Sequence, residues 1–307
     1  MIVVVAPGQG SQTPGFLDPW LELPGVAERL GAFGELAGID LVAAGTRWDA
    51  DAIRDTKVAQ PLIVAAGLVT LGQLPTDRIG GIAGHSVGEL TAAAGAGILG
   101  DEAAMTLVAE RGRAMAEAAA LEPTGMAAVV GGDETDVVAT LEYRGLVPAN
   151  MNGGGQIVAA GPRDAIALLA EEPPAGSRVI PLEVAGAFHT RFMEPAVERL
   201  RTAAAAVTAA DPRIPIWTNR DGSRVASGRA FLDLVVGQVA SPVRWDLVMA
   251  SLAAAGVTGV VELAPAGALA GLVKRGLKGV PVVAVKTPED LAAAAALIDG
   301  ESKGPNA

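Results

Sequence analysis

The sequence predicts an α/β protein built on a parallel sheet. Short β-branched runs alternate with long segments rich in Ala and Leu, as expected for buried parallel strands and the helices that cover them. The runs occupy residues 2–5, 79–83, 214–217, 257–263 and 280–285. Half of the 307 residues are hydrophobic, 19% are charged and no repeat is present, which excludes disordered, collagen-like and coiled-coil proteins. A chain of this length is expected to form two structural units.

Residues 125–184 follow a different order of elements. The pattern predicts a strand at 126–130, a helix at 133–143, strands at 146–151 and 156–160, a helix at 162–171 and a strand at 178–184. The order β-α-β-β-α-β is that of a ferredoxin-like unit. We therefore predict a ferredoxin-like subdomain at 124–185, inserted into a body formed by 1–123 and 186–300. Residues 301–307 lack an apolar anchor and are expected to form a mobile tail.

Charge and cysteine content limit the partners and the chemistry. The chain has 34 Asp and Glu against 23 Lys and Arg, with 3% aromatic residues, which argues against nucleic acid or an anionic membrane as the main partner. The longest uncharged stretch, residues 58–76, contains Gln60, Pro61 and Pro75 and is expected to be a buried helix rather than a membrane span. The absence of cysteine excludes disulfides, thiolate metal sites and a cysteine nucleophile, and a cytoplasmic location is expected.

The strongest local motif is Gly84-His85-Ser86-Val87-Gly88, between a predicted strand and a predicted helix at 89–99. In this context G-x-S-x-G forms a nucleophile elbow, in which small residues permit a strained turn that projects the serine hydroxyl. The helix N-terminus behind the turn stabilises negative charge. The alternative is a glycine-rich turn that only packs a strand against a helix. The motif makes Ser86 the candidate nucleophile.

A serine nucleophile needs a base, and the chain contains two histidines. His85 is adjacent to Ser86, but consecutive residues around a sharp turn project apart, so we expect a packing or turn residue there. His189 directly follows a predicted strand, at the rim where functional loops of an α/β sheet collect. A lone histidine is by default structural. Because no other base is available to the serine, His189 is the candidate general base.

Arg111 lies on the apolar side of a helix predicted at 101–120. Helical spacing places it inside an arc formed by Ala104, Met105, Val108, Gly112 and Met115. Arg113 instead shares the polar face with Glu102, Glu110 and Glu117. A buried guanidinium needs an anion, which is either a ligand carboxylate or an internal Asp or Glu. A side chain that snorkels from the edge of the arc is a further alternative.

Three weaker segments complete the candidates. Gln9 lies in the loop 7–12, whose glycines allow close approach to a ligand, although the third glycine of a dinucleotide fingerprint is misplaced. Asn152 lies in an Asn/Gly-rich run that by itself indicates a hairpin. The densest basic cluster comprises Lys274, Arg275 and Lys278, which ordinarily indicates a solvated helix face.

Together these segments resemble the malonyl-CoA:acyl carrier protein transacylase family and, more broadly, the acyltransferase domains of fatty acid and polyketide synthases. The matching segments run in family order over residues 1–286: 7–12, 60–61, 84–89, 111–115, 150–152 with 156–158, 186–190, and 238 with 241–245. The resemblance implies an α/β-hydrolase-like body interrupted by a ferredoxin-like subdomain, in agreement with the predicted elements.

The resemblance also implies roles for the residues at the elbow. It implies Ser86 as nucleophile and His189 as base, with Gln9 and the Val87 backbone N–H around the oxyanion. The backbone carbonyl of Gln238 would orient the histidine. No triad acid is evident, so the resemblance implies a serine–histidine dyad.

Further roles concern the substrate. Arg111 would clamp the free carboxylate of the malonyl group, and Asn152 matches a position near the active site. Phe188, directly before His189, is similar to malonyl-selective members, whereas a serine there is typical of methylmalonyl-selective ones. The segment before the histidine departs from other common family patterns, and the resemblance favours malonyl as the acyl group through Phe188.

The implied reaction is ping-pong transfer of malonyl from malonyl-CoA to the phosphopantetheine thiol of acyl carrier protein, with no bound cofactor and no metal. Lys274, Arg275 and Lys278 are candidate contacts for an acidic carrier protein. The alternatives are a serine esterase or thioesterase on the same elbow and a catalytically silent carrier-binding module. Arg111 favours transfer over the first, and the presence of both Ser86 and His189 argues against the second.

Overall fold

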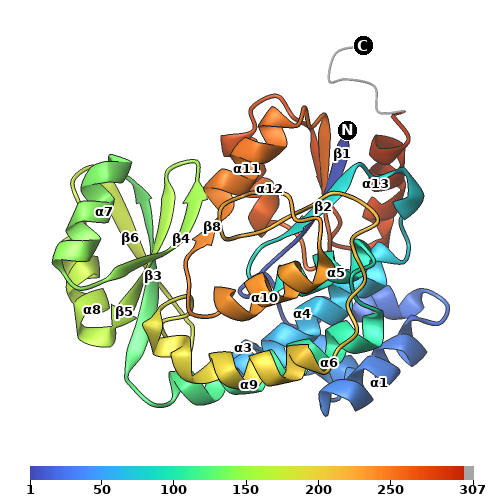
Figure 1. The fold of residues 1–307 in the computed structure, drawn as a ribbon, viewed down its shortest axis with the longest axis horizontal. Helices are drawn as coiled ribbons and strands as arrows, with labels where there is room; N and C mark the ends of the chain where they lie inside the picture. The colour runs from blue at the N-terminus through green and yellow to red at the C-terminus, as the bar shows by residue number, and fades with distance from the viewer. Residues whose placement is uncertain (301–307) are drawn as a thin grey trace.

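Two five-stranded β-sheets organise the chain (Figure 1). The computed structural model describes residues 1–300, so the expected tail at 301–307 lies outside the described residues. The first sheet has the order β10-β9-β1-β2-β7, and all neighbouring strands in it are parallel. Its strands are β1 (Ile2–Ala6), β2 (Gly81–Gly84), β7 (Ile216–Trp217), β9 (Gly259–Glu262) and β10 (Val282–Ala284). The predicted parallel sheet is confirmed, one strand for each β-branched run.

Helices bury both faces of this sheet because successive side chains of a strand point to opposite faces. Val4 packs with α4 and α6, whereas Val3 and Val5 pack with α11 and α12. The helices of the chain are α1 (Val26–Ala37), α2 (Leu41–Thr46), α3 (Ala50–Arg54), α4 (Thr56–Leu71), α5 (Gly88–Gly95), α6 (Asp101–Ala119), α7 (Glu134–Tyr143), α8 (Arg163–Glu171), α9 (Glu194–Ala205), α10 (Gly228–Gln238), α11 (Trp245–Ala254), α12 (Ala268–Gly276) and α13 (Leu291–Ile298). Short 3-10 helices cover Asp18–Glu22, Thr76–Arg78, Arg191–Met193 and Pro288–Asp290.

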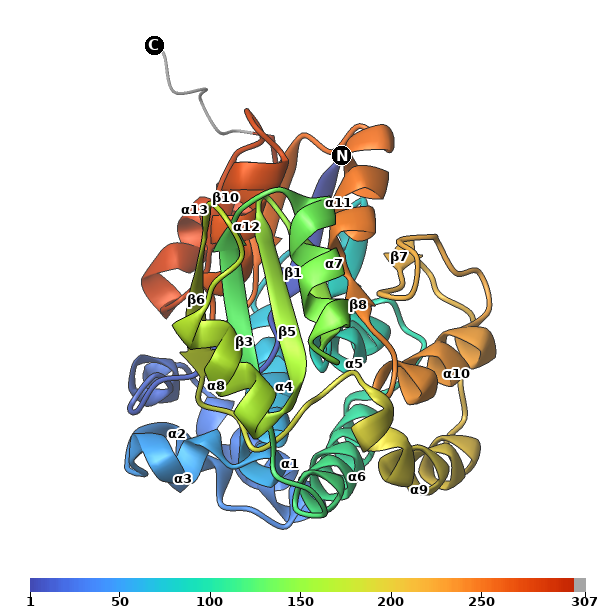
Figure 2. The same ribbon diagram turned by 90° about the vertical axis from the view of Figure 1, so that its left-hand side faces the viewer.

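The second sheet has the order β6-β3-β5-β4-β8. Its strands are β3 (Thr124–Gly131), β4 (Val147–Gly153), β5 (Gln156–Pro162), β6 (Ser177–Leu182) and β8 (Val243–Arg244). The first four pair antiparallel, and α7 and α8 cover one face (Figure 2). Ala127 and Val129 face those helices, whereas Met126 and Ala128 belong to the core of the body. The predicted order β-α-β-β-α-β is therefore present.

One strand of the second sheet was not predicted. β8 follows α10 in the chain and pairs in parallel with β4, through Val243 opposite Asn150 and Arg244 opposite Met151. Two residues are too short a run to show the alternation that marks a strand. The short connection from α10 to α11 thus ties the edge of the second sheet to the rest of the chain.

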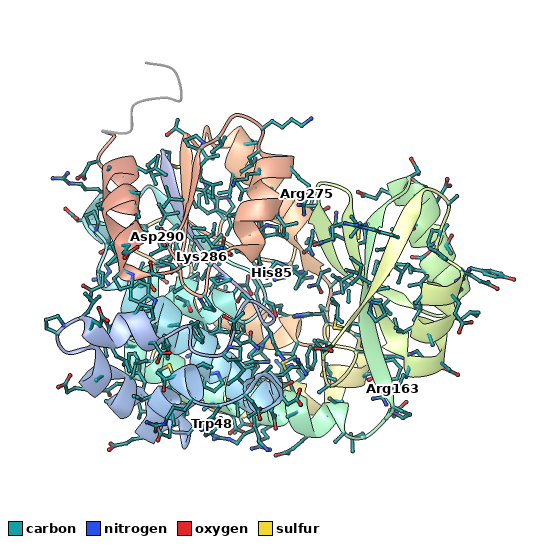
Figure 3. All side chains as sticks on the ribbon, turned by 180° about the vertical axis from the view of Figure 1, so that it is seen from behind. Trp48, His85, Arg163, Arg275, Lys286 and Asp290 are labelled. Carbon is teal, nitrogen blue, oxygen red and sulfur yellow. The ribbon has the colours of Figure 1, made fainter. Side chains whose placement is uncertain are left out.

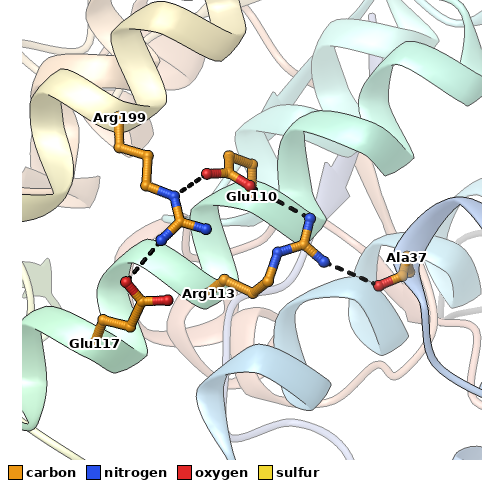
Figure 4. A network of polar contacts seen from close by, with 5 residues as sticks. All are labelled: Ala37, Glu110, Arg113, Glu117 and Arg199. Atoms are coloured by element: carbon orange, nitrogen blue, oxygen red, sulfur yellow. Dashed lines mark hydrogen bonds and ion pairs between the residues drawn. The ribbon is translucent and has the colours of Figure 1, made fainter.

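The long helix α6 directs one arginine into the protein interior and another onto its polar face, as the helical spacing predicts. Arg111 is buried, and Arg113 lies on the polar face, where it donates to the Ala37 carbonyl at 3.2 Å and pairs with Glu110 at 3.3 Å (Figure 4). Arg199 of α9 contacts Glu110 and also Glu117. The polar face of α6 is therefore used to attach α1 and α9.

The uncharged stretch forms the buried helix that was expected. Every residue of α4 except Lys57 is buried, and Pro61 lies inside the helix. None of the helices between residues 1 and 300 combines the length and apolar character that a membrane-spanning segment requires.

Parallel pairing brings the candidate residues to one edge of the first sheet. Ala6 at the end of β1 lies opposite Gly84 at the end of β2, so the loops after both strands leave the sheet side by side. β7 pairs with β2 and ends at the same edge. The β4–β5 hairpin of the second sheet closes the opposite side of this region, since Asn152 contacts His85. The carboxyl ends of adjacent strands are where an open α/β sheet binds ligands.

Candidate active site

Ser86 lies on a strained turn between β2 and α5. Its φ is 52°, in the left-handed region, and a Cβ at Gly84 would lie 2.0 Å from the Gly88 carbonyl carbon. A Cβ at Gly88 would lie 2.3 Å from the Ala6 carbonyl oxygen. Only glycine fits at either end of this turn, which is the physical reason for the G-x-S-x-G spacing. In residues 1–300, Ser86 and His189 are the two non-glycine residues with positive φ. Such strain concentrates at functional sites.

The Ser86 hydroxyl and the His189 ring are in hydrogen-bond contact. Ser86 Oγ lies 2.8 Å from His189 Nε2, and His189 Nδ1 lies 2.8 Å from the Gln238 carbonyl oxygen. A carbonyl only accepts, so Nδ1 carries the proton and Nε2 is free to accept one from the serine. Both ring nitrogens are thus occupied, and neither contacts a carboxylate among residues 1–300.

The electrostatic surroundings keep His189 neutral. Its side chain is buried, and burial together with the nearby positive charge of Arg111 lowers the pKa of His189 to about 3. A neutral imidazole is the form that accepts a proton.

His85 points away from the dyad and toward the second sheet. Its Nε2 lies 2.9 Å from Asn152 Oδ1, and its ring meets Trp245 edge-on, with 5.5 Å between ring centroids. Asn152 in turn donates to Gln156 Oε1 at 2.9 Å. Figure 3 shows His85 at the junction of the two sheets. The expectation that His85 is a packing and turn residue agrees with these contacts.

Arg111 is 1% exposed and its guanidinium lies behind the serine. Nη1 donates to Gln60 Oε1 at 2.7 Å, and Nη2 donates to Gln238 Oε1 at 2.9 Å and to Ser86 Oγ at 3.4 Å. Nε has no hydrogen-bond partner within residues 1–300, and no carboxylate there pairs with Arg111. Burial lowers the pKa of Arg111 to about 10, so the group remains charged at neutral pH. Arg111 thus makes no direct salt bridge among residues 1–300 and does not reach the surface, and the Glu89 carboxyl favours its charged form without a direct ion pair.

Three side chains of the network received no role in the sequence analysis: Glu89, Asn219 and Gln60. Glu89 accepts from the Asn219 backbone N–H at 2.6 Å and from the Gln238 side-chain amide. Burial raises the pKa of Glu89 to about 8, although the Asn219 N–H and the charge of Arg111 favour its ionised form.

Two of these three residues, Asn219 and Gln60, could have been identified from the sequence. Asn219 follows a predicted strand by two residues, so the argument that identified His189 at the sheet rim applies to it equally. Gln60 is a polar residue in an otherwise apolar segment.

A cavity of about 280 Å³ opens beside the dyad. Its lining includes Ser86, His189, Gln9, Val87, Phe188, Asn152, Gln60, Met115 and Arg275. Arg111 reaches this cavity only behind Ser86 and is not part of the lining. Most of the predicted site residues thus surround one space.

Two backbone N–H groups at this cavity are available to a ligand. Neither the Gln9 nor the Val87 N–H has a hydrogen-bond partner within residues 1–300. The side-chain amide of Gln9 is used elsewhere, because it donates to the Arg54 carbonyl at 3.3 Å. The backbone groups, and not the Gln9 side chain, are therefore the candidate donors to an oxyanion.

The basic cluster divides between cavity and surface. Arg275 lines the cavity and approaches Gly154 of the β4–β5 hairpin, as its position near the second sheet in Figure 3 indicates. Lys274 and Lys278 are exposed, and no salt bridge involves any of the three within the described residues.

A serine on a strained elbow, bonded to a neutral histidine beside a cavity with unused N–H donors, is an arrangement suited to an acyl-transferring enzyme. Comparison with known proteins agrees. The model of the acyl transferase domain family matches residues 3–295. The malonyl CoA-acyl carrier protein transacylase of Mycobacterium tuberculosis (strain H37Rv) is 52% identical over 298 residues, which cover 95% of this chain and 98% of that protein. The enzyme of the same name from Escherichia coli (strain K12) is 32% identical, covering 94% and 97%.

Solved structures give the same result. The crystal structure of MCAT from Mycobacterium tuberculosis superposes with a TM-score of 0.93 at 51% identity, covering 96% of this chain and 99% of that one. A malonyl-transacylase in complex with a type II PKS acyl-carrier protein superposes with a TM-score of 0.89 at 28% identity, covering 95% and 98%. The chain belongs to the malonyl-CoA:acyl carrier protein transacylase family.

The low pKa of His189 predicts a wide pH range for reaction at Ser86. We expect the rate of labelling by an uncharged fluorophosphonate to stay nearly constant from about pH 7 to about pH 5, because the base stays neutral well below the ordinary histidine pKa of about 6.5. Arg111→Gln removes a nearby positive charge and should raise the pKa of His189. In this variant the labelling rate should therefore begin to fall at a pH closer to neutral than in the wild type. If the wild-type labelling rate instead fell with a midpoint near pH 6.5, the low pKa of His189 would be contradicted.

Proposed function

We propose that this protein transfers the malonyl group from malonyl-CoA to the phosphopantetheine thiol of acyl carrier protein, through a malonyl ester on Ser86. The observation that carries the proposal is the 2.8 Å contact between the strained Ser86 and a neutral His189, with the Arg111 cation immediately behind the hydroxyl. The family membership supports malonyl as the acyl group.

The chemistry follows from the positions of the atoms. His189 Nε2 takes the Ser86 proton as Oγ attacks the thioester carbonyl, and the resulting oxyanion is stabilised by the Gln9 and Val87 N–H groups. Coenzyme A leaves as a thiol after His189 returns the proton to sulfur. The carrier thiol then gives its proton to His189 and attacks the ester, and His189 reprotonates Ser86 Oγ as the malonyl group leaves. Acyl exchange of this kind involves no oxidation, so we infer that no bound cofactor is needed.

Arg111 is proposed as the clamp for the free carboxylate of malonyl. Its guanidinium bonds to two neutral amide oxygens, Gln60 Oε1 and Gln238 Oε1, and its Nε–H has no partner within the described residues. A carboxylate bonds a guanidinium more strongly than a neutral amide does, and does so through two oxygens. Gln60 lines the cavity, so an incoming carboxylate can replace it as the partner of Nη1.

Asn152 and Phe188 are proposed to shape the rest of the acyl pocket. Asn152 is fixed between His85 and Gln156, and Phe188 is 6% exposed and lines the cavity next to His189. A bulky ring at this position would leave little room for an α-methyl branch. This supports the preference for malonyl over methylmalonyl.

We propose that the chain is organised as an α/β-hydrolase-like catalytic body, residues 1–123 and 186–300, with a ferredoxin-like subdomain at 124–185. The elbow after β2 of a parallel sheet supports the first part. The antiparallel order β6-β3-β5-β4 with α7 and α8 on one face supports the second. β8 connects the two, because it belongs to the body in sequence and to the second sheet in pairing.

The carrier protein is proposed to dock beside α12. Lys274 and Lys278 present unpaired positive charge there, and Arg275 continues it into the cavity wall. An acidic carrier would be attracted to this patch on an otherwise acidic chain, with its prosthetic arm entering beside Arg275. The complex of a related malonyl-transacylase with its acyl-carrier protein supports a carrier as partner. The cytoplasm remains the proposed location.

Loss of the nucleophile and loss of the base should be distinguishable. Ser86→Ala is expected to abolish the malonyl adduct seen by intact-protein mass after addition of malonyl-CoA. His189→Ala should slow formation of the adduct by roughly 10²–10⁴-fold, the range for loss of a general base. His85→Ala, which removes the other histidine, should slow it far less. Normal acylation of the His189 variant would remove His189 from the mechanism.

Arg111 should set acyl specificity. Removing an ionic bond to a bound carboxylate costs about 2–5 kcal/mol, so Arg111→Ala should lose kcat/KM for malonyl-CoA far more than for acetyl-CoA. Arg113→Ala is the matched control, because it removes the same side chain two residues along on the outer face of α6. Its malonyl:acetyl ratio should equal that of the wild type. If a folded Arg111→Ala variant kept the wild-type malonyl:acetyl ratio of kcat/KM, Arg111 would not be the clamp for the malonyl carboxylate.

The docking patch predicts an effect limited to the carrier. The double variant Lys274→Glu with Lys278→Glu should raise the KM for acyl carrier protein at low salt and leave the KM for malonyl-CoA unchanged, because both side chains lie outside the cavity lining. Arg163→Glu, a charge reversal at the start of α8, serves as the control. If both variants show the wild-type KM for the carrier, the carrier docks elsewhere.

A further inference from the structure

The side-chain amide of Asn219 bridges the two ends of the nucleophile turn. Its Nδ2 donates to the Gly84 carbonyl at 2.7 Å, and its Oδ1 accepts from the Ser86 backbone N–H at 2.7 Å. The residue is fully buried. One amide therefore satisfies the backbone groups on both sides of His85.

This pattern is that of a parallel β-ladder. In a parallel pair, one residue donates to the carbonyl before its partner and accepts from the N–H after it, which here are the carbonyl of Gly84 and the N–H of Ser86. The backbone pairing of β2 with β7 ends at Ala83 opposite Trp217. Two residues later, the Asn219 side chain takes the place of the missing peptide group. It extends the ladder into a turn that has left the strand conformation.

Asn219 is itself held on several sides. Its backbone N–H donates to Glu89 Oε1 at 2.6 Å, and its carbonyl accepts from the Arg244 N–H at 2.7 Å. Gln238 Nε2 donates to Asn219 Oδ1 at 3.1 Å and to the Ser86 carbonyl at 3.2 Å. The amide is thus fixed relative to the helix after the turn and relative to Gln238.

The same Gln238 holds the base, because its backbone carbonyl accepts from His189 Nδ1. Asn219 therefore contacts both the backbone of the nucleophile and the residue that orients the histidine. We propose that Asn219 is a positioning residue for acyl transfer, whose side-chain amide holds the Ser86 turn in its left-handed conformation and keeps Oγ within reach of His189. The proposal rests on the role of Ser86 as nucleophile proposed above.

Loss of the amide should therefore slow acylation without weakening substrate binding. For Asn219→Ala we expect the rate of fluorophosphonate labelling and kcat to fall by at least about tenfold, with the KM for malonyl-CoA within about twofold of wild type. Thr70→Ala is the control for stability, since it removes a buried hydroxyl that bonds to the Ala66 carbonyl in α4. The control should lower the melting temperature without changing the labelling rate.

Asn219→Asp gives a second, independent test. An ionised aspartate has no donor for the Gly84 carbonyl, whereas a protonated one donates an O–H there and still accepts from the Ser86 N–H. The ratio of variant to wild-type labelling rates should therefore rise by at least about tenfold from pH 8 to about pH 5. The titratable and charged groups around this position are Glu89 of α5, Arg111 of α6, His85, His189 and Arg244, and the wild type shares them all, so the ratio isolates position 219.

The outcomes separate the inference from the proposed function. A slow, acid-rescued Asn219→Asp variant supports the inference even if Asn219→Ala does not fold. A flat ratio across pH, or an Asn219→Ala variant that labels like the wild type, overturns it while leaving Ser86 as nucleophile. Absence of labelling in the wild type itself, or its persistence in Ser86→Ala, would instead overturn the proposed nucleophile.

Discussion

Arg111 carries a positive charge into the apolar interior, directly behind the Ser86 hydroxyl. A buried guanidinium cannot release its proton at neutral pH, so its surroundings have to supply oxygen atoms. Gln60 and Gln238 do so with neutral amides, and the Glu89 carboxyl, whose pKa is raised by burial to about 8, accepts from the Gln238 side-chain amide. The same cation lowers the pKa of His189 further than burial alone. The proposed specificity for an anionic acyl group and the neutrality of His189 thus share one cause.

The partners of Arg111 explain why the guanidinium is preorganised and yet available. Amide oxygens hold the side chain in place but neutralise none of its charge, whereas a bonded carboxylate would. In the clamp proposed for Arg111, the malonyl carboxylate would therefore be the first full counter-ion that this group contacts at the cavity. Glu89 remains one residue further away, and its raised pKa keeps both protonation states accessible near neutral pH.

The elbow shows a second constraint, which is steric. Gly84 and Gly88 leave no room for a Cβ, and Ser86 adopts a conformation that disfavours any side chain. A turn of this kind needs support from outside its own chain segment. Asn219 supplies it at the end of the β2–β7 ladder, and Gln238 connects that support to His189. Ser86 and His189 are thus held by one buried polar network, in which each group is fixed by the others.

Local sequence patterns determined the parallel strands, the glycines of the elbow and the inward direction of Arg111 against the outward direction of Arg113. These features depend on periodicity and on steric limits within a few residues, which the sequence displays directly. Elimination added His189, because only two histidines exist. The tertiary structure alone decided which side chains and strands meet. Gln60 lies 51 residues from its partner Arg111 in the chain, and Asn219 lies 133 residues from its partner Ser86. The strand β8 likewise joins a sheet whose other strands come much earlier in the chain. Hydrogen bonds between such distant residues leave no periodic trace, since they depend on where whole strands and helices pack.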